Sequence, residues 1–187
     1  MAGDPSDKNF DRVRRFRDAA LPYLDDVYTL ARYLLRDATD AEDAVQECYL
    51  RALTHFDTFH GTAIKPWLFA ILRNVCRSEF ARRSGVILRA DAADAGETGD
   101  GAEPMWCETP NSPETQLLHQ LDAATTRRLV ETLPKPFREV IVLREINDLS
   151  YREIADVIGA PIGTVMSRLA RARSMLRAAW TREKDEP

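Results

Sequence analysis

The clearest candidate chemistry in this chain is a set of hydroxyl and guanidinium groups on one helical face near the C-terminus. No carboxylate occurs from Val157 to Arg182, so this stretch can approach a polyanion without repulsion. Its spacing places four polar side chains opposite an apolar stripe, and such groups can contact base edges and phosphates in the major groove of DNA. Arg173 lies nearer the apolar side, along which its stem is expected to run. The predicted DNA-binding residues of this face are Thr164, Ser167, Arg168, Arg171 and Arg173.

A helix-turn-helix is predicted to hold these groups. Ser150 followed by Glu153 is a capping-box pattern that starts a first helix, and Gly159 is placed to end it. Pro161 suits the first turn of a second helix because it lacks an amide proton and has a fixed φ. The apolar residues of that second helix recur every three or four positions and should be buried: Ile162, Val165, Leu169, Ala172 and Leu176.

The N-terminal part of the chain also predicts amphipathic helices. One stripe runs from Leu24 to Leu35, and a second runs from Ala41 to Phe56 with Asp40 as its expected N-cap. A third helix is expected to follow Pro66. Its apolar side has Trp67, Leu68, Ile71 and Val75, and its other side has Arg73 and Arg77 with Asn74 at the edge.

An acidic segment separates the two helical parts. Residues 90–126 carry 8 acidic and no basic groups, whereas residues 127–187 carry 12 basic and 9 acidic groups, so the net charge of -4 hides an uneven distribution. The segment is rich in Ala, Gly and Asp and has no helical period, which is typical of a linker. We therefore predict an all-α protein with two small domains, residues 8–83 and 113–182, joined by a flexible acidic linker, residues 84–112, long enough to hold them apart.

Composition excludes several other classes. Cys48, Cys76 and Cys107 form no CxxC or Cys/His cluster, so we expect no disulfide framework, metal site or cofactor. The three histidines are scattered and no Gly-rich phosphate loop occurs, so an enzyme is not expected. No apolar run is long enough to span a bilayer and Met1 to Lys8 is polar, so we expect a cytoplasmic protein without membrane insertion.

Three segments in a fixed order resemble one family. Residues 40–47 look like the polymerase-binding helix of the extracytoplasmic-function (group four) sigma factors of bacterial RNA polymerase. Residues 65–74 look like the promoter-melting segment of that family, and residues 133–173 look like its fourth domain. The resemblance implies that the chain binds core RNA polymerase and promoter DNA and directs promoter-specific transcription initiation. It also implies that the chain responds to stress or another signal and is held inactive by an anti-sigma factor.

The resemblance also implies roles for particular residues. The polar side of the second helix would dock on core polymerase through Glu42, Asp43, Gln46 and Glu47, although an acidic helix face is otherwise commonly just solvated. For the minus-ten element, the loop 56–64 would receive an extracted base, at a cost of a few kcal/mol that is offset by aromatic stacking. Phe59 or Phe56 could stack on that base. The predicted minus-ten contacts are Phe59, Arg73, Asn74 and Arg77, and Thr164 to Arg173 would read the minus-thirty-five element.

Some alternatives remain open at this point. Met166 stands where relatives often carry a basic residue, which leaves one DNA contact unassigned. The acidic linker either imitates RNA in the polymerase or is a solvated spacer, and its Trp106 could dock on a partner. Cys107 or Cys48 could sense oxidants. The competing functions are a dimeric helix-turn-helix regulator and a decoy that binds an anti-sigma factor.

Overall fold

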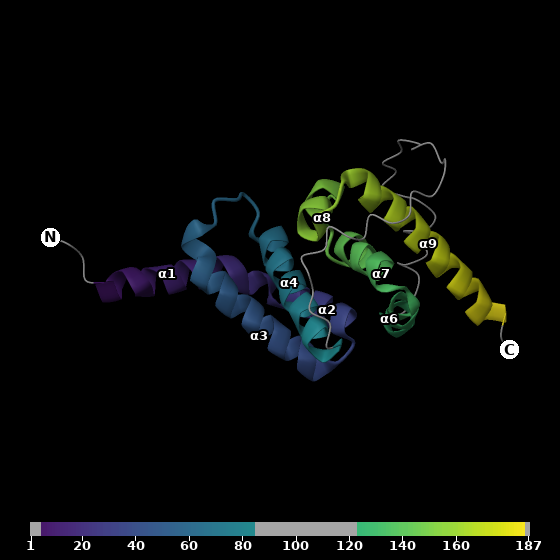
Figure 1. Ribbon diagram of the computed structural model, residues 1–187, viewed down its shortest axis with the longest axis horizontal. Helices are drawn as coiled ribbons and strands as arrows, with labels where there is room; N and C mark the ends of the chain where they lie inside the picture. Colours follow the sequence, from purple (N-terminus) through teal and green to yellow (C-terminus); the bar gives the residue numbers. More distant parts are fainter. Residues whose placement is uncertain (1–4, 85–122, 186–187) are drawn as a thin grey trace.

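The computed structural model describes residues 5–84 and 123–185, and every regular element in these two ranges is helical. The prediction of an all-α protein is therefore confirmed for the described residues (Figure 1). Most of the predicted linker lies outside the described residues, as do Trp106 and Cys107. The predicted domain boundaries remain predictions.

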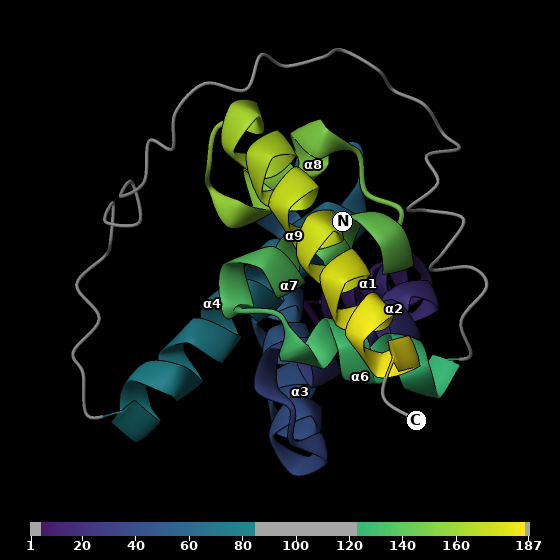
Figure 2. The same cartoon turned by 90° about the vertical axis from the view of Figure 1, so that its right-hand side faces the viewer.

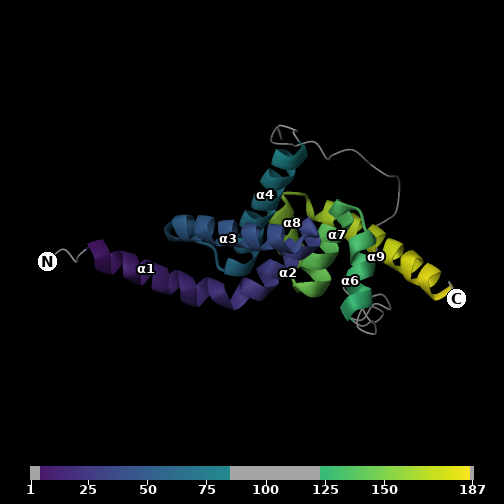
Figure 3. The same ribbon diagram turned by 90° about the horizontal axis from the view of Figure 1, so that it is seen from below.

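Four main helices form the N-terminal domain. They are α1 (Pro5–Ala20), α2 (Leu24–Leu35), α3 (Ala38–His55) and α4 (Ile64–Ser84), with short 3₁₀ turns at Leu21–Tyr23 and Phe56–Thr58. Helices α2, α3 and α4 pack on one another, whereas the N-terminal part of α1 extends away from them (Figures 1 and 3). The buried side chains at the centre of this packing include Leu30, Leu34, Cys48, Phe69 and Leu72.

Two details of these helices differ from the sequence predictions. Asp37, not Asp40, is the N-cap of α3, and its carboxylate accepts a hydrogen bond from the Asp40 amide at 3.0 Å. The expected Asp40 cap is wrong because the chain turns three residues earlier, after Arg36 adopts φ 66°. On α4 the buried face is centred on Phe69 and Leu72, so Trp67 lies at its edge and is half-buried.

The C-terminal domain has α6 (Ala123–Thr132), α7 (Lys135–Ile141), a π-helical turn (Val142–Ile146), α8 (Tyr151–Ile158) and α9 (Ile162–Asp185). The π-turn continues α7 without a break and ends at Asn147, whose side-chain amide donates to the Val142 carbonyl at 3.0 Å. Asp148 then turns the chain at φ 58° toward α8. This compact reversal brings α8 and α9 onto α7.

The helix-turn-helix has the predicted caps. The Ser150 hydroxyl accepts from the Glu153 amide at 3.3 Å, and the Glu153 carboxylate accepts from the Ser150 amide at 2.8 Å. Gly159 ends α8 at φ 65°, a conformation that glycine adopts without a steric penalty. Pro161 lies one residue before α9, and its carbonyl accepts the first bonds of that helix from Thr164 and Val165.

The apolar stripe of α9 is confirmed at four of its five positions. Val165, Leu169, Ala172 and Leu176 are buried, but Ile162 is exposed. Ile162 is the first residue of α9, where the helix begins after the turn, and its side chain is 42% exposed.

The two domains pack against each other. Helix α4 lies on α8 and helix α2 lies on α7, so helices far apart in the sequence run side by side (Figures 1 and 2). Buried residues of both domains belong to one apolar cluster. The linker length allowed well-separated domains, but in this structure they share an interface.

Both described cysteines are buried in the N-terminal core. Burial raises the pKa of Cys48 to about 12 and that of Cys76 to about 12. The thiolate is the reactive form, so neither residue suits an oxidant sensor. The thiol-sensing hypothesis does not fit Cys48, and Cys107 lies outside the described residues.

The capping box gives a first prediction. Replacing Ser150 with Ala should lower the free energy of unfolding by about 1 kcal/mol, because α8 loses its N-cap acceptor. Replacing Ser150 with Thr should retain most of the stability, because threonine keeps the hydroxyl.

The same capping box predicts a pH dependence. Hydrogen bonds from Ser150 lower the pKa of Glu153 in the folded state. The contribution of Glu153 is therefore present at neutral pH and is lost as the pH falls through its folded pKa, so the difference between wild type and Glu153→Gln should shrink in acid. Chemical denaturation at several pH values measures both effects; equal stability of Ser150→Ala and wild type would contradict the assignment.

A second prediction concerns the buried thiols. In a Cys107→Ser variant, Cys48 and Cys76 should react with a disulfide reagent at pH 7 roughly a hundredfold more slowly than in denaturant, because burial disfavours the thiolate. Absorbance of the released thiolate follows the reaction. Rapid labelling of the native variant would show that one of these sites opens.

Candidate nucleic-acid interface

Helix α9 presents the polar face that the sequence predicts. Ser167 and Arg171 are exposed, and Thr164 and Arg168 are half-buried beside them. The Ser167 hydroxyl donates its proton to the Thr164 carbonyl at 3.1 Å, so its oxygen can still act as an acceptor. The face can therefore offer guanidinium donors and a hydroxyl acceptor to the major groove of DNA, which admits a helix.

Arg173 differs from the other predicted contacts of α9. Its guanidinium donates to Glu145 Oε1 at 2.7 Å through Nη2, and the two side chains are 22% and 11% exposed. Burial lowers the pKa of Arg173, but the hydrogen bond and the charge of Glu145 outweigh this and raise it. In this structure Arg173 fastens α9 to the π-turn, which fixes the angle of the α9 polar face.

The loop before α4 brings two aromatic rings together. The Phe59 and Trp67 rings have centroids 4.7 Å apart and planes tilted by 34°. Gly61 permits this packing, since a Cβ at that position would lie 2.6 Å from Phe59 Cε2. Asn74 is exposed about two turns after Trp67 on α4, so its amide is available to a ligand.

The two arginines of α4 have a different environment. Arg73 Nε lies 2.7 Å from Glu139 Oε1 of α7, and the side chains are 18% and 7% exposed. Arg77 is half-buried on the same side of the helix, 40° around from Arg73 at about 100° per residue. The structure therefore places Arg73 against the C-terminal domain. Of the three residues of α4 that were predicted to contact DNA, only Asn74 is exposed.

Helix α3 carries the predicted acidic face. Glu42, Asp43 and Gln46 are exposed, and Glu47 accepts from Arg51 Nε at 2.6 Å one turn later. Leu50, which the sequence did not single out, is 62% exposed next to these acids. Its place outside the buried stripe could be predicted from the helical period.

A groove of about 650 Å³ separates the α4 loop from the C-terminal domain. The N-terminal side contributes Phe56, Phe59 and residues Thr62 to Pro66, and the opposite side includes the turn from Asn147 to Leu149. Lys65 crosses the groove: its ammonium donates to the Asn147 carbonyl at 2.8 Å and pairs with Asp26 at 2.9 Å. The aromatic loop therefore faces the helix-turn-helix domain.

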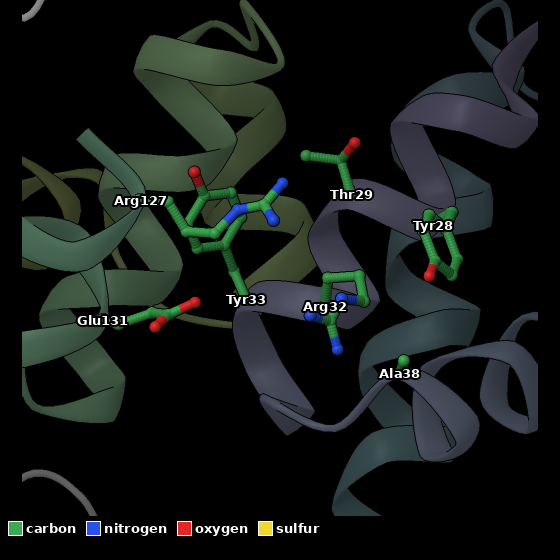
Figure 4. A pocket seen from close by; sticks show the side chains of 7 residues that line it. All are labelled: Tyr28, Thr29, Arg32, Tyr33, Ala38, Arg127 and Glu131. Carbon is green, nitrogen blue, oxygen red and sulfur yellow. The ribbon is translucent and has the colours of Figure 1, made fainter. Parts of the chain in front are cut away.

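A smaller pocket of about 230 Å³ lies at the other contact between the domains (Figure 4). Arg127 of α6 and Tyr33 of α2 lie next to each other there, with Glu131 beside them. Burial raises the pKa of Tyr33, and a hydrogen bond with Arg127 opposes that rise. This pocket is part of the domain interface.

Within residues 5–84 and 123–185, no three His, Cys, Asp or Glu side chains are arranged to hold a metal ion. None of the helices described is both long and apolar enough to cross a membrane.

Comparison with known proteins assigns both domains. Residues 20–86 match the family model described as Sigma-70 region 2, and residues 124–176 match the model described as Sigma-70, region 4. The chain is 36% identical over 163 residues to the ECF RNA polymerase sigma factor EcfG of Rhodopseudomonas palustris, covering 87% of this chain and 83% of that protein. It is 31% identical to SigW of Bacillus subtilis, covering 87% of each chain.

Solved structures show the same relationship. The sigma factor RpoE of Bartonella quintana, in complex with the anti-sigma factor NepR, aligns with a TM-score of 0.66 and 27% identity over 93% of this chain and 99% of that one. CnrH in complex with the cytosolic domain of CnrY aligns with a TM-score of 0.62 and 25% identity over 92% and 90% of the two chains. Such proteins are initiation factors rather than enzymes. These matches explain why an acidic helix, an aromatic loop before α4 and a C-terminal helix-turn-helix follow one another in this order. The chain belongs to the extracytoplasmic-function sigma factors, which direct RNA polymerase to promoters.

Proposed function

We propose that the three surfaces described above divide the work of promoter recognition. The face of α9 reads the minus-thirty-five element, the loop 56–64 with Asn74 reads the minus-ten element, and the acidic face of α3 docks on core polymerase. The observation that carries this division is the exposure of Ser167, Arg171 and Asn74 on two different domains, with no carboxylate on α9 until Glu183.

Electrostatics supports the separation of roles. Phosphates attract Arg171 and its neighbours and would repel Glu42 and Asp43 on α3. The acidic face, with the exposed Leu50 at its C-terminal end, instead suits a basic protein surface. The two kinds of partner thus bind different sides of one chain.

The proposed setting is the bacterial cytoplasm, with control by an anti-sigma factor. The solved structure of the RpoE relative contains an anti-sigma factor, and the similarity extends over 93% of this chain. The pocket between Tyr33 of α2 and Arg127 of α6 offers such an inhibitor polar and aromatic groups from both domains. A search for a co-purifying inhibitor tests this part.

Transcription in vitro with core polymerase on random promoter fragments is the decisive experiment. Promoter-specific initiation that depends on the added chain is the expected result. Binding of free duplex at symmetric half-sites, without any effect on core polymerase, would instead indicate a dimeric regulator.

Changing Arg171 to Ala should weaken binding to the minus-thirty-five element of the promoter. The loss of binding free energy should be about 1 to 3 kcal/mol if the guanidinium contacts a base, and smaller if it contacts only a phosphate. Transcription from promoters with altered minus-thirty-five bases separates these cases. Arg182→Ala is the matched control, because Arg182 is exposed about three turns further along α9 and contacts the Ala178 carbonyl. Equal losses in the two variants would show that net charge alone matters.

Changing Asn74 to Ala should reduce promoter melting about tenfold, because an amide that contacts an unstacked base is lost, while upstream duplex binding stays intact. Permanganate reactivity of unpaired thymines measures melting. Ser78→Ala is the control: Ser78 is exposed one turn later and donates to the Asn74 carbonyl at 3.0 Å. A parallel loss of upstream binding in Asn74→Ala would contradict the division of roles.

A further inference from the structure

The exposed surface of α9 has two flanks of different chemistry. At about 100° per residue, Arg171 lies on one flank together with other polar side chains, and Ser167 lies at the centre. The other flank is uncharged, and its side chains follow one another at intervals of four residues. This apolar flank consists of Ile162, Met166 and Ala170.

The apolar flank is left open by the rest of the described protein. Ile162 is 42% exposed, although it fits the period of the buried stripe of α9. Ala170 is exposed as well, and Met166 between them is half-buried. Apolar surface that stays in contact with water gains free energy when a ligand covers it. The flank is therefore both accessible and favourable to cover.

The backbone next to this flank can approach a ligand closely. A Cβ at Gly163 would have no atom of the described residues within 4 Å. Packing inside the protein therefore does not require a glycine at this position, and alanine has the higher helix propensity. A residue without a side chain instead lets the first turn of α9 come close to another molecule.

The chemistry of the flank discriminates among base edges. In the major groove every base pair presents hydrogen-bonding groups, and thymine adds a C5 methyl group. Aliphatic side chains cannot replace the water that a base donor or acceptor would lose on contact, and such a loss costs free energy. The methyl group of thymine is the group on the groove floor that these side chains can cover without this cost.

These observations identify a ligand group for the apolar flank. We propose that Ile162 and Met166 read thymine methyl groups in the minus-thirty-five element, while Arg171 and its neighbours hold the helix on phosphates or other bases. The two side chains are four residues apart, which is about 6 Å along the helix and matches about two base pairs at 3.4 Å each. The inference rests on the proposed role of α9 and deepens it. It assigns to Met166 the DNA contact that the sequence left open.

The test removes methyl groups from the DNA without changing any hydrogen-bonding group. Holoenzyme is assembled from core polymerase and the full chain, and the probe is a duplex fragment of a promoter from which it initiates. Deoxyuridine replaces thymidine at one position of the minus-thirty-five element at a time, on either strand. In competition binding, one or two neighbouring replacements should weaken binding by about fourfold each, the effect of about one buried methyl group. The other replacements should have no effect.

Two variants should abolish this sensitivity. Holoenzyme with Ile162→Ala or Met166→Ala should bind thymine and deoxyuridine equally at the position that the removed side chain contacts. The conservative changes Ile162→Val and Met166→Leu should retain the preference, because both keep an apolar group there. The matched control is Met175→Ala, since Met175 is 38% exposed further along α9 but lies on another side of the helix. Its preference should equal that of the wild type. Circular dichroism verifies that each variant is folded.

Equal binding of thymine and deoxyuridine at every position would overturn the proposal. A deoxyuridine effect that persists in both Ile162→Ala and Met166→Ala would overturn it too, because the methyl group would then act through the shape of the DNA.

The proposed function can fail separately. If Arg171→Ala weakens binding to the minus-thirty-five element but no methyl group matters, only the role of the apolar flank fails. If Arg171→Ala binds that element like the wild type, the role of α9 fails as well.

Discussion

The burial of α4 on two sides is the constraint on which the rest of the structure depends. One side of this helix, with Phe69 and Leu72, completes the N-terminal core against α2 and α3. Another side contacts α8 and α7 of the C-terminal domain. Because one helix serves both interfaces, any movement between the domains exposes α4 without dismantling the core that positions it. The helix can therefore stay folded while its partner changes.

The ion pairs of the two domains have different consequences. Arg173 and Glu145 are close within one domain and fix the orientation of α9, whereas Arg73 and Glu139 join two domains. A buried pair adds little net stability because desolvation offsets the attraction, but losing one partner leaves a costly isolated charge. Such a contact is well suited to specify one arrangement of domains and to be exchanged for another partner that carries an anionic oxygen.

Local signals in the sequence were sufficient for most of the secondary structure. The capping box at Ser150 and the glycine at Gly159 specify α8 through bonds that span at most a few residues, so they could be read directly. Asp40 was a wrong choice for the α3 cap because Asp37 carries the same chemistry three residues earlier. Ile162 fits the apolar period of α9 but is exposed, because the period of one helix does not show which of its residues a second helix covers.

The sequence by itself determined the helices, the family and the polar face of α9, because these depend on spacing along one chain. Only the tertiary structure decided what Arg73 contacts. Its partner Glu139 lies 66 positions away, beyond a segment that has no helical period, and nothing in the local pattern links the two. Contacts between domains depend on how two finished surfaces fit, so the pairing of Arg73, a predicted DNA contact, with a buried glutamate appears only when both domains are placed together.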